Sequence, residues 1–139
     1  MKTIRTWIYA ILKYKENIVV ILKKRWPFTG LYDLPGGKIE HWENHISALK
    51  RELEEEAQLS ANEWKKVVDL VPTPGYCNEK IHLYEAKGIQ HLENAAPLDE
   101  DEFVSIEWIP VEEVIQKIHN GEITDAKTII AVQYAALHQ

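Results

Sequence analysis

The chain of 139 residues is 45% hydrophobic and 27% charged, which is typical of one globular domain, here expected to span residues 1–139. A net charge of −6 and a single short basic run at Lys23–Arg25 argue against a nucleic-acid polymer as partner, because phosphate backbones are bound by clustered basic surfaces. The lone Cys77 rules out an internal disulfide and no apolar stretch has the length of a membrane span, so we expect a cytoplasmic protein without a membrane partner.

The first part of the chain predicts short strands joined by turns. The apolar runs Thr6–Leu12 and Ile18–Leu22 flank a polar segment, a pattern typical of a β-hairpin. Proline and glycine mark Trp26–Gly30 as a loop, and the short apolar segment Tyr32–Leu34 stops at the turn residues Pro35–Gly37. A hairpin followed by a glycine turn is therefore expected.

From Asn44 the apolar residues change to a helical period. Asn44 is a plausible N-cap, because its side chain can accept a hydrogen bond from the first turn. A helix is expected to extend to Ala57. Its buried face consists of residues three or four positions apart: Ile46, Leu49, Leu53 and Ala57.

The second half of the chain predicts three further strands and two helices. The strands are Lys65–Val71, Lys80–Ala86 and Phe103–Ile109, and an acidic loop at 94–102 precedes the last of them. One helix starts at Pro110 and ends at Asn120-Gly121; the other runs from about Asp125 to Leu137, with Ile129, Ile130, Val132 and Ala136 facing inward. A mixed sheet with helices on it follows, either α+β or an α/β/α sandwich.

The helix that begins at Asn44 has a second face rich in glutamate. Glu52 and Glu56 are four residues apart and project side by side, where their like charges repel. Arg51 can offset part of this repulsion through Glu55, which is also four residues away. One interpretation is a solvated acidic face. The other is a site for hard divalent cations, which prefer carboxylate and water oxygens.

The glycine pair Gly36-Gly37 precedes the same helix. Glycine permits backbone conformations that bring a carbonyl oxygen close to a metal ion or a phosphate. An acidic protein can bind a phosphorylated small molecule when metal ions bridge the two negative partners. The pair and the glutamates together fit a metal site for a diphosphate, and a solvated acidic face is the other interpretation.

One spacing pattern combines these features: Gly37, five residues, Glu43, seven residues, Arg51-Glu52-Leu53, one residue, Glu55-Glu56, one residue, Gln58-Leu59. This pattern resembles the Nudix box of the Nudix hydrolases. Gln58 departs from it, because the family usually has glycine there. Since that glycine ends the helix, we expect a different exit turn in this chain.

The resemblance implies an α/β/α sandwich with a mixed sheet that hydrolyses a nucleoside diphosphate linked to another moiety. It implies Mg²⁺ as the cofactor, with Mn²⁺ as an alternative. The residues implied to bind metal are Gly36 (through its carbonyl), Glu52, Glu55 and Glu56. The residues implied to be structural are Gly37, Glu43 and Arg51, of which Arg51 pairs with a box glutamate and positions it.

Two regions after the box, 72–86 and the acidic 99–103 with 121–128, resemble ADP-ribose pyrophosphatases. By position, the resemblance implies Glu100 as the base that activates water and Glu102 as a further metal ligand. If the loop takes no part, a box glutamate (Glu55 or Glu56) is the base; a merely solvated acidic loop is the other interpretation. Arg25 is a candidate clamp for a substrate phosphate, because its planar guanidinium suits bidentate contacts.

ADP-ribose pyrophosphatases usually have an N-terminal extension that helps to build a dimer and the adenosine pocket, and little of this chain precedes the box. A homodimer is still kept as an expectation. Any aromatic stacking on the base would come from elsewhere, and the candidates are Trp7, Trp26, Phe28 and Tyr76. Two alternatives are kept: a MutT-like enzyme that cleaves nucleoside triphosphates such as oxidised dGTP, and a nucleotide-binding regulator without catalysis.

Overall fold

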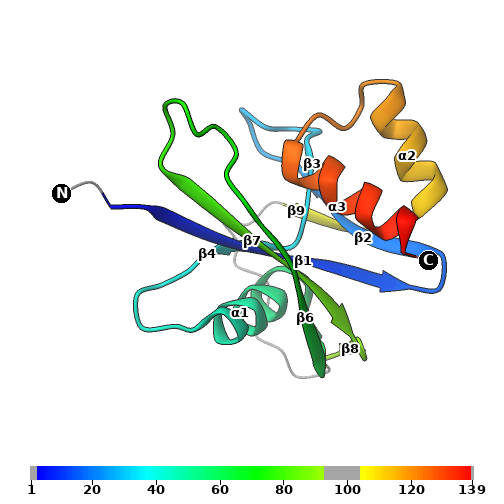
Figure 1. Cartoon of the computed structure of the whole chain (residues 1–139). Helices are drawn as coiled ribbons and strands as arrows, with labels where there is room; N and C mark the ends of the chain where they lie inside the picture. The colour runs from blue at the N-terminus through cyan, green and yellow to red at the C-terminus, as the bar shows by residue number, and fades with distance from the viewer. Residues whose placement is uncertain (1–2, 93–103, 139) are drawn as a thin grey trace.

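Nine strands and three helices follow one another along the described residues, 3–92 and 104–138, of this computed structural model (Figure 1). The strands are β1 (Arg5–Tyr14), β2 (Asn17–Lys23), β3 (Tyr32–Asp33), β4 (Gly36–Lys38), β5 (Leu59–Ser60), β6 (Glu63–Leu70), β7 (Glu79–Lys87), β8 (Gln90–His91) and β9 (Val104–Pro110). The helices are α1 (His45–Ala57), α2 (Val111–His119) and α3 (Ala126–Leu137). Within the described part of the chain, no helix is both long and apolar enough to cross a membrane.

Strand β1 lies at the centre of a mixed sheet. The strand order is β3-β2-β1-β7-β6, with β4 also paired to β1 and β9 paired to β2. Along residues 5–12, β1 runs parallel to β7. Its other edge is divided, because β4 pairs with its first half and the start of β2 with its end. The predicted hairpin is confirmed, and it closes at the pair Tyr14↔Asn17.

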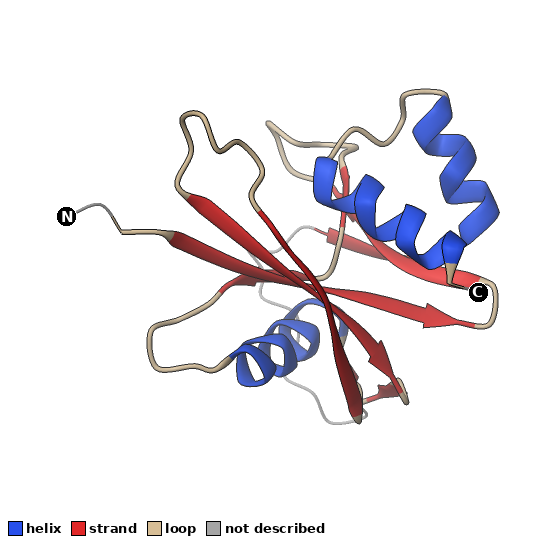
Figure 2. Ribbon diagram, in the orientation of Figure 1, coloured by secondary structure: helices blue, strands red, loops and turns tan. Residues whose placement is uncertain are grey.

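Helix α1 covers one face of the sheet, and α2 and α3 cover the other (Figure 2). Because side chains alternate along a strand, Ile8 and Ala10 of β1 pack in the core beneath α1, whereas Tyr9 and Ile11 pack in the core beneath α2 and α3. Coverage on both faces explains why β1 reads as a continuous apolar run. The architecture is the predicted α/β/α sandwich with a mixed sheet.

Helix α1 begins at its predicted cap and packs its predicted stripe on the core, where Ile46 and Ala57 are only partly buried. The Asn44 side chain accepts a hydrogen bond of 2.8 Å from the Ser47 backbone N–H. Leu49 and Leu53 are buried in the core that also contains Ile8 of β1. Glu52, next to Leu53, has only 9% of its surface exposed. A carboxylate buried to that extent needs polar partners, which the site supplies.

The prediction for the inward face of α3 is partly wrong. Ile130 is 38% exposed, whereas the fully buried residues of the helix are Thr128, Ala131, Val132 and Ala135. In a helix of 3.6 residues per turn, these four positions share one face and Ile130 points away from it. The small alanines are buried because α3 packs closely on α2 and β1, and hydrophobicity alone does not predict that.

Three short strands were not predicted. Gly36 and Gly37, expected in a turn, belong to β4, which pairs with β1 through Tyr9↔Gly36. Strands β5 and β8 pair only with each other and have two residues each, too few for a recognisable alternation. Phe103, the predicted start of the last strand, lies outside the described residues, and β9 is described from Val104.

The expected difference in the exit turn of α1 is also wrong. Gln58 has φ 54° and ψ 40°, which is the left-handed conformation that glycine adopts most easily at this position. Its backbone N–H still donates to the Glu54 carbonyl at 3.2 Å. The helix therefore ends as it would with glycine, and the non-glycine residue bears the conformational cost.

Replacing Gln58 by glycine should increase the free energy of unfolding by about 0.5–1 kcal/mol, because glycine adopts the left-handed conformation without a steric penalty. Chemical denaturation of the two proteins measures the difference. Gln58→Ala is the matched control, since it also removes the side chain but keeps a Cβ. If alanine stabilises the protein as much as glycine does, the backbone explanation is wrong.

Candidate active site

Strand β4 approaches its neighbours so closely that neither of its glycines has room for a side chain. Gly36 has φ 149°, and a Cβ there would collide with the Ile8 carbonyl and with Tyr9, both in β1. A Cβ on Gly37 would lie 2.5 Å from Oε1 of Glu52 in α1. At both glycines, the added Cβ would come closer to these atoms than an ordinary contact allows. Because both residues lack a side chain, the backbone of β4 can lie directly against the carboxylates of α1.

Two box glutamates face this backbone. Glu56 Oε1 accepts a hydrogen bond of 2.9 Å from the Gly36 N–H. Glu52, one helical turn earlier, is buried beside Gly37. The third glutamate, Glu55, has half of its side chain exposed. The structure thus brings together Gly36, Glu52 and Glu56, as the spacing predicts, and leaves Glu55 nearer to solvent.

Arg51 joins the charges around these glutamates. Its guanidinium binds Glu43 through two hydrogen bonds, Nε to Oε2 at 2.7 Å and Nη2 to Oε1 at 2.9 Å. Its Nη1 donates to Glu52 at 3.0 Å and to Glu55 at 3.3 Å. Nη2 also donates to the Lys38 carbonyl of β4 at 3.1 Å. One guanidinium therefore orients Glu52 and ties the glycine strand to α1; the expected pairing with Glu55 is present.

The Glu43–Arg51 contact also fixes the charges of both groups. The hydrogen bond from Arg51 holds the pKa of the Glu43 carboxyl below its usual range. The same bond raises the pKa of the Arg51 guanidinium above its usual value. Both groups therefore stay ionised at neutral pH, and the repulsion between the box glutamates is offset by a permanent positive charge.

The donor set at this site suits a hard divalent cation. Carboxylate oxygens of Glu52 and Glu56 lie beside a backbone strand with its own carbonyls, and such oxygens are the ligands that Mg²⁺ and Mn²⁺ prefer. Among residues 3–92 and 104–138, no three His, Cys, Asp or Glu side chains converge as a ready-made metal cage. The chemistry fits an ion that keeps several water or substrate ligands.

Tyr9 connects the box to charged residues on the other side of the sheet. A Cβ on Gly36 would lie 2.6 Å from Tyr9 Cδ1, so the tyrosine ring lies directly against the glycine strand. Burial, reinforced by the nearby carboxylates of Asp33 and Glu56, raises the pKa of the Tyr9 phenol far above its usual value. Tyr9 is thus a neutral residue between two charged groups, and no sequence motif singled it out.

The remaining candidates have no contact with the box carboxylates among the described contacts, or lie outside the described residues. Glu100 and Glu102 fall in 93–103, which lies outside the described part of the chain. Arg25 lies exposed in the loop between β2 and β3. Trp26 and Tyr76, two of the candidate stacking aromatics, are 85% and 90% exposed. Phe28 is also exposed, whereas Trp7 is partly buried and packs on the core.

A polar cluster under the N-terminus of α1 was not predicted. His45 Nδ1 and the Tyr84 hydroxyl are 2.8 Å apart, and His82 Nδ1 lies 2.6 Å from Asp69 Oδ1. The two histidine rings are 4.2 Å apart. Hydrogen bonds from Lys66 and then His82 lower the pKa of Asp69 to about 2. The cluster attaches the start of α1 to β6 and β7, and local sequence gives no signal for it because its members are far apart in the chain.

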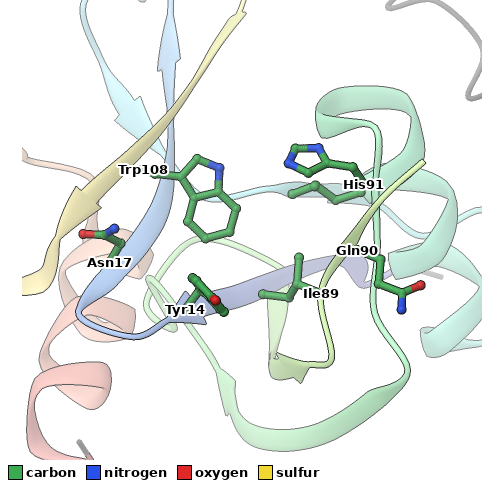
Figure 3. Close-up of a pocket in the computed structure, with 7 residues that line it drawn as sticks. Tyr14, Asn17, Ile89, Gln90, His91 and Trp108 are labelled. Carbon is green, nitrogen blue, oxygen red and sulfur yellow. The ribbon is translucent and has the colours of Figure 1, made fainter. Parts of the chain in front are cut away.

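A separate cavity of about 400 Å³ lies beside the β1–β2 turn (Figure 3). Its lining residues are Tyr14, Asn17, Leu59, Ile89, Gln90, His91 and Trp108. Among the described residues, its lining includes none of the box carboxylates. The cavity and the glutamate site are therefore distinct features of the molecule.

The combination of an α/β/α sandwich with glutamates of α1 facing the glycines of β4 is specific enough to compare with known proteins. The chain matches the NUDIX domain over residues 1–132 and thus belongs to the Nudix hydrolase family, whose members generally use divalent metal ions. It is 39% identical over 126 residues to the methanol dehydrogenase activator of Bacillus methanolicus, covering 90% of this chain and 68% of that protein. It is 32% identical over 124 residues to the ADP-ribose pyrophosphatase of Bacillus subtilis, covering 88% and 67%.

Solved structures show the same fold. A crystal structure of an ADP compounds hydrolase superimposes with a TM-score of 0.79 at 20% identity, covering 96% of this chain and 72% of that one. A MutT NUDIX hydrolase from Burkholderia pseudomallei gives a TM-score of 0.70 at 22% identity, covering 95% and 98%. The α/β/α arrangement predicted from sequence is thus shared with other Nudix proteins.

Gly37→Ala should reduce hydrolytic turnover by about tenfold or more, because the added Cβ would displace the Glu52 carboxylate and misplaced catalytic groups are costly. Turnover of one nucleotide substrate is measured for the unmodified protein, for Gly37→Ala and for a control variant. Glu54→Ala, at an exposed position of α1, is the control and should leave turnover unchanged. Equal activity of Gly37→Ala and Glu54→Ala would contradict the importance of this contact.

Proposed function

We propose that the protein is a divalent-metal-dependent hydrolase that cleaves ADP-ribose to AMP and ribose 5-phosphate. The observation that carries the proposal is the meeting of Glu52 and Glu56 with the Gly36-Gly37 backbone, organised by Arg51. Such a site combines fixed carboxylates with a backbone that a phosphate can approach closely. It matches the chemistry of a diphosphate held by metal ions.

The proposed metal is Mg²⁺, with Mn²⁺ as an effective substitute. When bound, it would polarise a diphosphate oxygen and lower the pKa of a water molecule. Glu52 and Glu56 would hold it, together with the Gly36 carbonyl, and Glu55 would assist directly or through water. Glu102, which lies outside the described residues, is proposed as a further ligand.

The protein's own groups have two tasks in the proposed reaction: one activates the attacking water and one holds a phosphate. Glu100 takes a proton from the attacking water, whose oxygen forms a bond to one phosphorus of the diphosphate. The bond from that phosphorus to the bridging oxygen breaks in line, and the bridging oxygen leaves with the other phosphate. Arg25, from the loop between β2 and β3, contacts a phosphate of the substrate. If Glu100 takes no part, Glu55 or Glu56 is the proposed base.

The choice of ADP-ribose is supported by similarity. The Bacillus subtilis relative named an ADP-ribose pyrophosphatase is aligned with 88% of this chain. The segments 72–86 and 121–128, which resemble that subfamily, lie outside the box, where substrate selection is expected. A cytoplasmic location and a homodimer accompany this proposal as predictions from the sequence.

A regulatory role is a second candidate. It is favoured by the 39% identical relative that is named a methanol dehydrogenase activator. Glu52, Glu55 and Glu56 are all present, however, and a site that had lost catalysis would be expected to lose such carboxylates first. Tight nucleotide binding without hydrolysis would favour the regulator over the enzyme.

The function is tested by incubating the protein and Mg²⁺ with ADP-ribose, GDP-mannose, ATP and 8-oxo-dGTP in parallel. Chromatography of the products should show AMP and ribose 5-phosphate, with ADP-ribose having the highest kcat/KM. A higher kcat/KM for the triphosphates would instead support the MutT-like alternative. No turnover of any compound, together with measurable binding, would support the regulator.

Glu56→Gln should lower kcat by about 100-fold or more, because loss of a metal-binding carboxylate removes charge stabilisation of the transition state. The fold should persist, since a glutamine oxygen can still accept the Gly36 N–H. Glu54→Gln, on the exposed face of the same helix, is the control and should leave kcat unchanged. A near-normal rate for Glu56→Gln would remove the metal-site assignment.

The same assay applied to Glu100→Gln separates the two candidate bases. If Glu100 is the general base, kcat should fall at least about tenfold. This threshold is conservative, because general-base catalysis usually contributes more than that. A smaller loss would assign the base to the box helix.

A further inference from the structure

Lys127 is a largely buried positive charge on the face of the sheet opposite α1 (Figure 2). It lies in the first turn of α3, and only 12% of its side chain is exposed. Its Nζ is 2.9 Å from Asp33 Oδ1 and 3.0 Å from Asp125 Oδ2, and it lies 4.5 Å from the centre of the Tyr9 ring. Burial lowers the pKa of Lys127, but the two carboxylates raise it by more. The side chain is therefore a permanent ammonium held by two carboxylates.

Asp33 connects this ammonium to the segment that enters the site. The same Asp33 Oδ1 accepts a hydrogen bond of 2.7 Å from the Leu34 backbone N–H. That bond fixes the direction in which the chain leaves β3. Three residues after Asp33, the Gly36 N–H donates to Glu56 of α1. A short path of contacts thus leads from Lys127 to the box.

This path crosses the sheet. Lys127 belongs to α3 on one face, and Glu56 belongs to α1 on the other (Figure 1). Between them lie the segment from Asp33 to Gly36 and the ring of Tyr9. This ring contacts Lys127 and lies against Gly36. A shift of Asp33 would be transmitted to Gly36, because the intervening residues are few and buried Leu34 cannot move freely.

We propose that Lys127 is a positioning residue for the metal site: through Asp33 it fixes the strand that presents Gly36 to Glu56. The inference rests on the proposed function, because it presumes a divalent ion at the box. It adds a residue that lies on the opposite face of the sheet and outside the Nudix box.

The sign of one measurement separates position from charge. Removing an ammonium near a cluster of carboxylates makes the site more negative, which by itself would strengthen cation binding. Loss of the clamp on Asp33 would instead weaken binding, because metal ligands lose affinity when their supporting partners are removed. If Lys127 contributed only to folding, its replacement would leave the affinity of the folded protein for the cation unchanged.

The test is a titration of the full chain with Mn²⁺, without substrate, in which electron paramagnetic resonance measures free Mn²⁺. Lys127→Met is expected to raise the Kd for Mn²⁺ by about tenfold. Lys117→Met is the matched control, since it also removes a lysine from an ion pair, the 3.1 Å contact with Glu122. Its Kd should equal that of the unmodified protein.

Two further variants keep the proposal testable if Lys127→Met fails to fold. Asp33→Asn removes the ion pair with Lys127, and that with Lys23 at 3.6 Å, but can still accept from the Leu34 N–H. Asp125→Asn leaves the Asp33 contact intact and is still a good cap for α3. Positioning predicts weaker Mn²⁺ binding for Asp33→Asn only. A pure charge effect predicts weakening in both, since each removes one carboxylate.

Several results would overturn the inference: tighter or unchanged Mn²⁺ binding in Lys127→Met, equal effects of Asp33→Asn and Asp125→Asn, or no Mn²⁺ binding by the unmodified protein. The last result would also remove the metal assignment at the box. Failure to hydrolyse ADP-ribose, with the expected Mn²⁺ pattern intact, would contradict only the proposed substrate.

Discussion

The site depends on the close packing of strand β4 against β1 on one side and α1 on the other. Gly36 has no room for a Cβ because β1 occupies the space, and Gly37 has none because Glu52 does. The two glycines therefore matter for different reasons: a Cβ on Gly36 would meet the backbone of β1, and a Cβ on Gly37 would displace the Glu52 carboxylate. This close approach allows a backbone N–H to reach Glu56, which turns a helix face into a site with both backbone and carboxylate groups.

The second constraint is electrostatic. Clustered glutamates repel one another, and burying a carboxylate such as Glu52 is costly unless it is paired. Arg51 meets both costs, since one guanidinium contacts Glu43, Glu52 and Glu55 and also the backbone of β4. Glu43 binds the guanidinium in a bidentate arrangement and fixes its plane. The remaining donors of Arg51 can then point at Glu52 and Glu55, so the Glu43–Arg51 ion pair helps to orient carboxylates that would bind metal.

The sheet holds these parts in place from both faces. The divided edge of β1 admits β4 next to the helix, while its parallel pairing with β7 supports the opposite edge. Under the start of α1, His45 and Tyr84 attach the helix to β7. On the other face, Lys127 meets Asp33 at the entrance to the glycine strand. The functional face of α1 is thus fixed at its N-terminus, at its middle and through the strand beside it, which suits a site that must keep several oxygens in one arrangement.

The sequence by itself determined the hairpin, the cap and apolar stripe of α1, and the spacing that identifies the family, because each depends on residues a few positions apart. Tertiary structure decided that Gly36 and Gly37 form a strand, that Gln58 ends the helix as glycine would, and that Ile130 faces outward while small alanines are buried. It also decided which carboxylate is buried. The contact between Gly36 and Glu56, 20 residues apart in the chain, and the positioning of a box glutamate by Arg51 were expected only through the resemblance to a known motif. The contact between Lys127 and Asp33 joins different layers of the fold and had no such signal in the sequence, because it is set by how strands and helices pack.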